Sequence, residues 1–318
     1  MESRAYLLHA LSPLHVGTGQ SVGVIDLPLM RMRSTGIPFV PGSSLKGVLR
    51  ELKRPGAASG PEDEARHGAV FGPKRERPGP EGDVTGDYAG ALVVGDARLL
   101  ALPVRSFVGT FALVTSPLLL VLAERDLGGL SGGTGAPLVV KPLEKRGARV
   151  ASLKDGANVY RRPGQPPRVY LEDLDVEVES VDDAALAEWS RRLARVLPEA
   201  ERELLVRRLV LVDDETMSFL WETATQVDTR VSIDPATGTA AQGQLWTEES
   251  LPAETLLVGV MGATRANHPA KRLEAGEVLA EALGGDVSVV QLGGKATVGR
   301  GRCRLLAWPG AEPAGAGR

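Results

Sequence analysis

GIPFVPGSSLKGVLR, residues 36–50, begins with the pattern of a β-strand and ends with that of an α-helix. Its apolar residues 37–40 predict the strand, and two prolines with Gly42 end it. Ser43 or Ser44 then suits the N-cap of a helix, because a hydroxyl can accept a hydrogen bond from an otherwise unpaired amide. The segment therefore predicts a strand that leads directly into a helix.

The helix predicted over residues 43–53 carries two different faces. Its apolar residues recur at helical spacing and predict one buried stripe: Leu45, Val48, Leu49 and Leu52. Lys46 and Arg50 lie four residues apart and share another face. Together with the free N–H groups of the helix N-terminus, these cations predict an anion site. The alternative is an amphipathic surface helix whose basic side chains are solvated.

The composition is that of an ordinary soluble globular protein, with 43% hydrophobic and 24% charged residues. No apolar run is long enough to span a membrane, and the N-terminus lacks the apolar core of a signal peptide. One cysteine, Cys303, excludes an intrachain disulfide and a cysteine-based zinc site. These features predict a cytoplasmic protein.

Charge is distributed unevenly along the chain. The net charge is −3, but residues 31–54 carry +5 and residues 291–304 carry +4, which leaves −12 on the remainder. Two basic, glycine-bearing segments on an acidic body indicate a localised track for a polyanion rather than nonspecific nucleic-acid binding.

The remaining elements follow from periodicity and turn residues. Strands are expected at 4–11, 91–102, 107–114, 209–213, 255–263, 286–292 and 302–307, and further helices at 117–127, 182–197, 214–224 and 272–284. Residues 225–247 predict a long β-hairpin that projects, because few apolar residues occupy its faces. Residues 54–90 are rich in Pro, Gly and charge and predict an irregular insertion. A disordered tail is expected at 309–318.

Without the insertions, the order of elements is strand, helix, strand, strand, helix, strand. This is the order of ferredoxin-like and RNA-recognition-motif (RRM-like) folds, so the predicted class is α+β. Aromatic residues are only 4% of the chain, and the aromatic signature of true RNA-recognition motifs is absent. Recognition of nucleic acid is therefore expected to use backbone and shape rather than base stacking.

A glycine-rich loop, GGKATVGRG, occupies residues 293–301. Lys295 mimics the lysine of a phosphate-binding loop, but Ala296 stands where that motif needs Ser or Thr, which argues against nucleotide triphosphate binding. The glycines instead allow backbone N–H groups to approach phosphates closely. Ser43 and Ser44 fit caps and phosphate contacts better than nucleophiles, since no Ser-His-Asp grouping accompanies them.

Several motifs together resemble the RAMP superfamily of CRISPR proteins: HVGTG at 15–19, IDLP at 25–28, PFVPGSSLKG at 38–47 and the glycine-rich loop. The IDLP segment and the hairpin end LWTEE, residues 245–249, are most similar to the repeated backbone subunit of type III-B (Cmr) effector complexes. The similarity spans nearly the whole chain and implies a single domain over residues 1–308. Residues 54–90 and 130–180 carry little of it.

The resemblance implies a ferredoxin-like or RRM-like palm with large insertions, namely helical fingers and a β-hairpin thumb at 225–247. Such subunits stack along one CRISPR RNA beside other copies and other subunits. Each thumb displaces a base of the guide–target duplex, and each subunit cuts the facing single-stranded target RNA with a divalent metal, Mg²⁺ or Mn²⁺. No membrane partner is implied.

The resemblance also assigns candidate site residues. Asp26 is implied as the catalytic acid and metal ligand, although without the family a turn cap before Pro28 would be favoured. His15 matches another position of that site, and Glu248 and Glu249 lie where further polar residues contribute, with Glu248 taken as the candidate. The candidate RNA-binding residues are Ser43, Ser44, Lys46, Arg50, Arg230, Lys295 and Arg300.

Two alternatives to a target-cleaving subunit stay open. One is a non-catalytic RNA-binding scaffold in which Asp26 is inert. The other is a metal-independent ribonuclease that processes CRISPR RNA with His15 as acid and base. Substitution of Asp26 separates the first alternative from target cleavage, and metal dependence separates the second.

Overall fold

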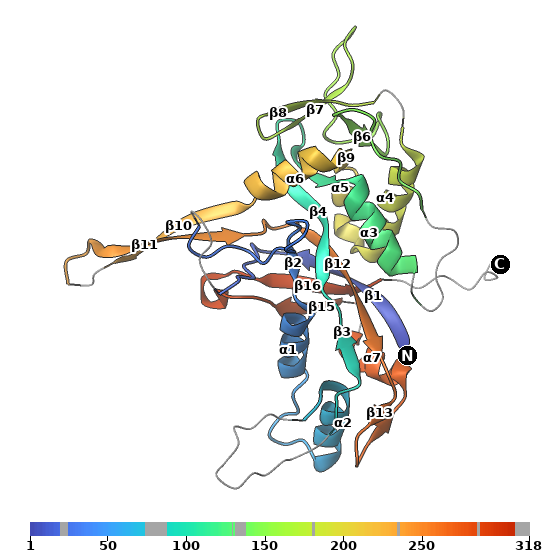
Figure 1. Cartoon of the computed structure of the whole chain (residues 1–318), viewed down its shortest axis with the longest axis vertical. Coiled ribbons are helices and arrows are strands. Elements are labelled where there is room, and N and C mark those ends of the chain that lie inside the picture. The colour runs from blue at the N-terminus through green and yellow to red at the C-terminus, as the bar shows by residue number, and fades with distance from the viewer. Residues whose placement is uncertain are drawn as a thin grey trace, which may run out of the picture.

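The structure is a computed structural model that describes residues 1–19, 25–73, 88–128, 130, 138–179, 182–233, 236–284 and 287–308 (Figure 1). Its helices are α1 (Gly42–Leu52), α2 (Pro61–Phe71), α3 (Pro117–Gly128), α4 (Ala184–Val196), α5 (Glu199–Val206), α6 (Asp214–Thr223) and α7 (Ala275–Leu283), with a 3₁₀ turn η1 at Ala296–Val298.

The strands are β1 (Glu2–Ala10), β2 (Phe39–Val40), β3 (Leu92–Val94), β4 (Ala97–Ser106), β5 (Thr110–Thr115), β6 (Ala148–Val150), β7 (Arg168–Leu171), β8 (Leu174–Glu177), β9 (Leu209–Val212), β10 (Gln226–Ile233), β11 (Ala240–Ser250), β12 (Leu256–Ala263), β13 (Ala266–Asn267), β14 (Arg272–Leu273), β15 (Val287–Gln291) and β16 (Arg302–Ala307). Helices and strands are thus mixed along the chain, which confirms the predicted α+β class.

A large sheet organises the described part of the chain, with the strand order β15-β16-β1-β12-β4-β5-β9-β6. Its centre is the antiparallel set β16-β1-β12-β4. In sequence, α1 lies between β1 and β4, and α7 lies between β12 and β16. Strand β5 pairs in parallel with β9, so the sheet is mixed rather than purely antiparallel.

Strand β1 is buried on both faces, because helices cover both sides of the sheet. Tyr6 and Leu8 face a core that includes side chains of α1, α2 and α7. Ala5 and Leu7 face a second core formed with α3, α4 and α5. Figure 1 shows these two groups of helices below and above the centre of the sheet. A strand that is covered by helices on both faces has apolar residues at successive positions, as at residues 5–8.

The predicted helix after residue 42 is confirmed, but a serine cap is wrong. Helix α1 begins at Gly42 with Pro41 at the N-cap and no side-chain cap, and Ser43 is exposed. The Gly42 N–H instead donates to Asp96 Oδ1 at 2.8 Å. A Cβ on Gly42 would lie 2.0 Å from the carbonyl oxygen of Val94, so close packing against the sheet fixes the start of the helix.

The expectation of an irregular insertion at 54–90 is wrong over residues 61–71, which form α2. Pro61 occupies the first helical turn together with Glu62, Asp63 and Glu64, where a fixed φ and negative charge both favour a helix. Its last turn is buried, from His67 to Phe71. Residues 74–87 lie outside the described residues, as does the tail expected at 309–318.

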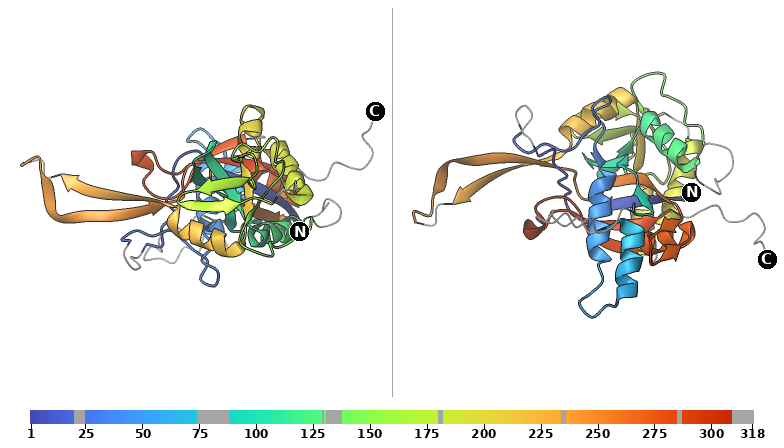
Figure 2. Two further views of the ribbon diagram at one scale, coloured as in Figure 1. Left: turned by 90° about the horizontal axis from the view of Figure 1, so that it is seen from above. Right: turned by 60° about the horizontal axis from the view of Figure 1, so that its bottom comes forward.

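The long hairpin expected at 225–247 is confirmed and extends to Ser250. Strands β10 and β11 pair from Gln226–Ser250 to Val231–Leu245, with a register shift before Ile233 pairs with Ala240. The hairpin projects far from the rest of the molecule in every view (Figure 2). Residues 234 and 235, between the two strands, lie outside the described part of the chain. Among the described helices, none is long and apolar enough to cross a membrane.

Candidate functional site

Asp26 is attached to the base of the projecting hairpin. Its Oδ2 accepts hydrogen bonds from the Thr247 N–H at 2.8 Å and from Thr247 Oγ1 at 3.0 Å. The neighbouring Leu27 forms a parallel bridge with Glu248, so the backbone around Asp26 runs beside β11. Asp26 is exposed. The backbone and side-chain hydrogen bonds from Thr247 lower the pKa of Asp26, which keeps it ionised at neutral pH.

Glu248 follows Thr247 on β11, but its carboxylate is buried and bonded to several partners. Its Oε1 accepts from Trp246 Nε1 at 2.7 Å and pairs with Lys295 Nζ at 2.8 Å. Arg230 Nε approaches Oε2 at 3.6 Å. Burial raises the pKa of Glu248, but the bonds from Lys295 and Trp246 and the two cations outweigh it, so its pKa is lowered. Glu248 is therefore an ionised anchor for two predicted RNA-binding cations.

Arg300 is also held by the hairpin. It is buried, and its Nη2 pairs with Asp228 Oδ2 on β10. Asp228 lies directly opposite Glu248 in the antiparallel register, so the two carboxylates share one face of the hairpin. Lys295 and Arg300 thus bind two acids side by side, and the glycine-rich loop is fastened to the hairpin base. Both cations therefore form ion pairs within the chain.

Gly293 of this loop is required by a close contact. A Cβ on Gly293, where φ is +72°, would lie 2.1 Å from the carbonyl oxygen of His15. The adjacent Gly294 N–H donates to that same oxygen at 3.0 Å. Only glycine fits such a left-handed position at this distance. The loop therefore sits directly on the segment that carries His15.

His15 is buried, and its Nδ1 lies 2.6 Å from the carbonyl oxygen of Glu249. A carbonyl oxygen only accepts, so Nδ1 carries the proton and Nε2 is left as the acceptor in the neutral ring. Gly17 packs beside Nε2, because a Cβ there would lie 2.7 Å from it. His15 thus fixes the hairpin base, while its predicted catalytic part stays a prediction.

The predicted residues of α1 lie elsewhere. Ser43, Lys46 and Arg50 line a cavity of about 840 Å³ together with Phe71 and Tyr88. Lys46 Nζ donates to the carbonyl oxygen of Leu92 at 2.7 Å, and Arg50 donates to that of Pro73 at 2.6 Å. Burial and then the charge of Arg50 lower the pKa of Lys46. Ser44 is half-buried in the same helix.

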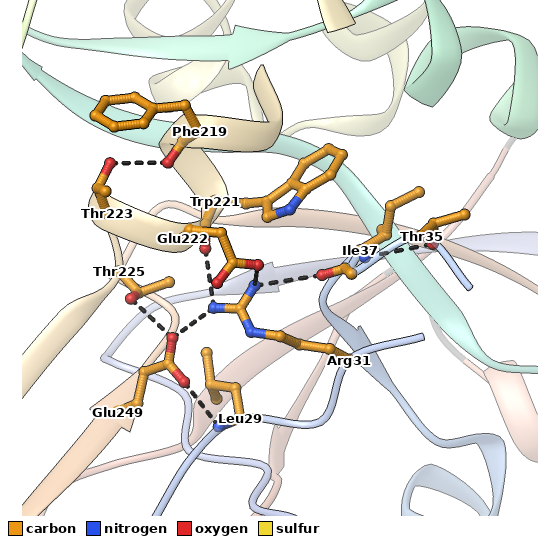
Figure 3. Close-up of polar contacts among 11 residues, drawn as sticks. Leu29, Arg31, Thr35, Ile37, Phe219, Trp221, Glu222, Thr223, Thr225 and Glu249 are labelled. Carbon is orange, nitrogen blue, oxygen red and sulfur yellow. Dashed lines mark hydrogen bonds and ion pairs between the residues drawn. The ribbon is translucent and has the colours of Figure 1, made fainter. Parts of the chain in front are cut away.

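Sequence reasoning missed Thr247 and Arg31. Figure 3 shows Arg31 between Glu249, Glu222 and the backbone of Trp221, with Thr225 also bonded to Glu249. No local signal marks either residue, because the partners lie about two hundred positions away in sequence. Adjacent residues of a strand point to opposite faces, which explains why Glu248 and Glu249 have separate sets of partners.

The side chains present supply only part of a metal site. No group of three or more His, Cys, Asp or Glu that could hold an ion occurs within the described ranges. Glu248 is engaged by cations, and Glu249 pairs with Arg31 at 2.5 Å. Asp26 remains as an exposed, ionised carboxylate, the type of ligand that Mg²⁺ and Mn²⁺ prefer. The chemistry of this carboxylate fits a hard cation, and the acids beside it within the described ranges, Glu248 and Glu249, are already paired with cations.

The chain is similar to known proteins in both sequence and fold. Residues 7–304 match the sequence profile of the RAMP superfamily. The chain is 32% identical over 300 residues to the CRISPR system Cmr endoribonuclease Cmr4 of Pyrococcus furiosus, with 94% of each sequence covered. The crystal structure of oligomeric Cmr4 from Pyrococcus furiosus has a TM-score of 0.67 at 25% identity and covers 96% of this chain and 99% of that one.

A further structure supports the likeness of fold alone. A chain of the type III-B Cmr-beta complex bound to cognate target RNA, 20% identical, has a TM-score of 0.69 and covers 96% of this chain and 97% of that one. The profile spans most of the sequence, and the identity to the curated relative holds over nearly its full length. The chain therefore belongs to the RAMP superfamily, as its motifs led us to expect.

Proposed function

We propose that the protein is a CRISPR RNA-binding backbone subunit of a type III-B effector complex, and that it cleaves the target RNA paired to the guide. The observation that carries the proposal is the placement of Asp26. It is an exposed, ionised carboxylate held by Thr247 at the root of a projecting hairpin. A relative 32% identical over nearly its whole length is named an endoribonuclease, which supports the same activity here.

In this proposal, the antiparallel set β16-β1-β12-β4 with α1 and α7 is the ferredoxin-like palm. The order of these strands, with helices in the two crossovers, supports that assignment. The helices α3 to α5 on the other face would be the fingers, and β10-β11 the thumb. The thumb presents apolar side chains to solvent along one face, namely Val227, Val231, Ile233 and Leu245. Such a face suits insertion beside RNA bases or against a further copy of the subunit.

The residues around Asp26 favour its action as an anion. Thr247 orients the carboxylate and keeps it charged, so Asp26 is suited to act as an anion rather than as a proton donor. Lys295 and Arg230 beside Glu248 keep positive charge near the hairpin base, where a phosphate backbone would run. The nucleophile in the proposed cleavage is the 2′-hydroxyl next to the scissile phosphate.

We also propose that a divalent metal, Mg²⁺ or Mn²⁺, takes part. Asp26 would be its protein ligand, and phosphate oxygens of the RNA and water would complete the set. A bound cation would offset negative charge on the scissile phosphate. A metal-independent ribonuclease based on His15 is less favoured, because that ring is buried and its Nδ1 is bonded to the Glu249 carbonyl.

The proposed function is tested with protein assembled on a guide RNA and an end-labelled complementary target. We expect cuts at regular intervals along the paired region and no cutting of an unrelated RNA. A single 2′-deoxy nucleotide at one cut position should block that cut and leave the others. A target that stays intact throughout, with the guide bound, would leave the scaffold alternative as the function.

Removal of divalent metal should abolish cleavage by this assembled protein. With EDTA we expect the rate constant to fall by about two orders of magnitude or more, since one protein carboxylate cannot replace the cation. Adding excess Mg²⁺ or Mn²⁺ should restore the rate, and a target-binding assay in EDTA controls for assembly. Cleavage at an unchanged rate in EDTA would contradict the metal and favour the metal-independent alternative.

Replacing both Lys46 and Arg50 by Gln should weaken guide binding equally for all spacer sequences. Removing one cation that pairs with a phosphate lowers the slope of log affinity against log salt by about one, so a reduction of about two is expected. The charge-reversed pair, with Glu at both positions, should weaken binding further. Arg191 and Arg195 on α4, both exposed, provide the matched control with the same change of charge. Weaker binding confined to some spacer sequences, or an unchanged salt slope, would contradict a role in holding phosphates.

A further inference from the structure

Arg31 joins three separate parts of the chain. Its Nη2 donates to Glu249 Oε1 at 2.5 Å, on β11, and to the Trp221 carbonyl at 2.9 Å, on α6. Its Nη1 donates to the Gly36 carbonyl at 3.3 Å and lies 3.4 Å from Glu222 Oε1. Figure 3 shows the guanidinium at the centre of these partners. One side chain therefore connects the Asp26 segment, the hairpin base and the end of a helix.

Burial makes these bonds costly to break. The side chain of Glu249 is 3% exposed, and that of Arg31 is 19% exposed. Removal of one partner from a buried ion pair leaves an uncompensated charge, whereas replacing both partners by apolar groups is often tolerated. The Trp221 carbonyl belongs to the last turn of α6, where carbonyls lack helical partners and a cation is favourable.

Glu249, which Arg31 holds in place, is hydrogen-bonded to the segment that carries Asp26. Its Oε2 accepts from the Leu29 N–H at 2.9 Å, and its own N–H donates to the Leu27 carbonyl at 3.0 Å. Leu27 in turn donates to the Thr247 carbonyl at 3.1 Å. The carboxylate that Arg31 fixes is therefore bonded to Leu29, three residues from Asp26, and the backbone of the same Glu249 is bonded to Leu27, the neighbour of Asp26. A shift of Glu249 would move the backbone on which Asp26 sits.

We propose that Arg31 is a positioning residue for cleavage, which acts through Glu249 to hold Asp26 against the hairpin base. This inference rests on the proposed function. Neither Arg31 nor Glu249 needs to touch RNA, because both are turned into the protein. Displacement of a catalytic group by about 1 Å can lower a rate about a hundredfold, so a positioning residue far from the reacting atoms is effective.

The test uses the assembled complex and single-turnover cleavage at saturating protein. For Arg31→Met we expect a rate constant about 10- to 100-fold lower, with target affinity within about twofold of wild type. Arg31→Lys should be intermediate, because it keeps the charge beside Glu249 but loses the fork that reaches two carbonyls. Amide hydrogen exchange at Leu27, Leu29 and Thr247 should be faster in both variants.

The double variant R31M/E249M separates positioning from stability. It removes the orphaned carboxylate but also the acceptor of the Leu29 N–H, so resistance to urea should return part of the way toward that of the wild type, while cleavage stays low. Arg192→Met is the matched control, because Arg192 on α4 and Glu124 on α3 form a partly buried pair at 2.6 Å, with both side chains 12% exposed. That variant should lose stability and keep the cleavage rate constant.

Two results would overturn the proposal. One is wild-type cleavage by Arg31→Met in assembled complex. The other is a double variant in which cleavage recovers together with stability, since that would make Arg31 purely structural. Failure of the proposed function gives different outcomes, because either the wild-type complex would leave the target intact or Asp26→Asn would cleave at the wild-type rate whatever the Arg31 variants do.

Discussion

Asp26→Asn should lower target cleavage by about two orders of magnitude or more and leave assembly and target binding near normal. Asparagine keeps the size of the side chain, and its carbonyl oxygen can still accept the Thr247 N–H bond that Asp26 accepts at 2.8 Å. The negative charge alone is lost. A group that only capped the turn would tolerate this change, whereas an anion that acts on the scissile phosphate or its metal would not.

The measurement is a time course of target cleavage with assembled complex. Asp173→Asn, an exposed carboxylate between β7 and β8, is the matched control for loss of one negative charge. Because the pKa of Asp26 lies below its ordinary value, its titration should not change the wild-type rate between about pH 5 and 8. An Asp26→Asn complex that cuts as fast as the wild type would make the subunit a scaffold.

Local pattern predicted most of the elements correctly, because the signals that form them are local. Helix α4 follows its apolar stripe, with Leu186, Trp189, Leu193 and Val196 all buried, and the Asp183 side chain caps its N-terminus. The hairpin is equally well marked by alternation on either side of a turn. The signals that define such elements, namely apolar spacing, caps and turn residues, all lie within the element itself.

The missed features depend on contacts between distant segments. The start of α1 is set by packing of Gly42 against Val94 and Asp96 rather than by a serine hydroxyl. Helix α5 follows α4 after Pro198 and is missed because it is only eight residues long, with Leu205 as its one buried residue, which is too short for a repeated apolar stripe. The predicted helix at 272–284 is wrong at its first residues, because 272 and 273 form β14 and pair with β13, so α7 begins at Ala275.

The candidate site was predicted as a set of residues but not as an arrangement. Lys295 and Arg300 are candidate RNA-binding residues, and in the structure each is paired with a hairpin carboxylate. Sequence could not show this, because Asp228 is far from Arg300 in the chain. The partners of Glu248 and Glu249 could not be predicted from the sequence either, because the pleat of β11 turns these neighbouring side chains to opposite faces.

The glycine-rich loop provides the second large effect, because two of its glycines have nearly the same backbone and different surroundings. Gly299 has φ of +80° and nothing within 4 Å of a Cβ placed there. Gly301 has φ of +78°, but a Cβ would lie 1.8 Å from the Leu292 carbonyl oxygen. Any alanine at either position adopts an unfavourable left-handed backbone, which costs about 1 kcal/mol.

Gly301→Ala should therefore destabilise the protein by about 3 kcal/mol or more beyond the cost of Gly299→Ala, since the clash is with backbone and cannot be relieved by a rotamer. To escape it, the loop must give up the bond from the Leu292 N–H to the Gly301 carbonyl, at 2.8 Å, or that from the Gly301 N–H to the Pro13 carbonyl, at 2.9 Å. Denaturation in urea of the two variants and the wild type measures the difference. Equal stability of the two alanine variants would contradict this prediction. It would mean that the loop backbone moves away from the clash without loss of stability, and that both glycines are needed only for their φ angles.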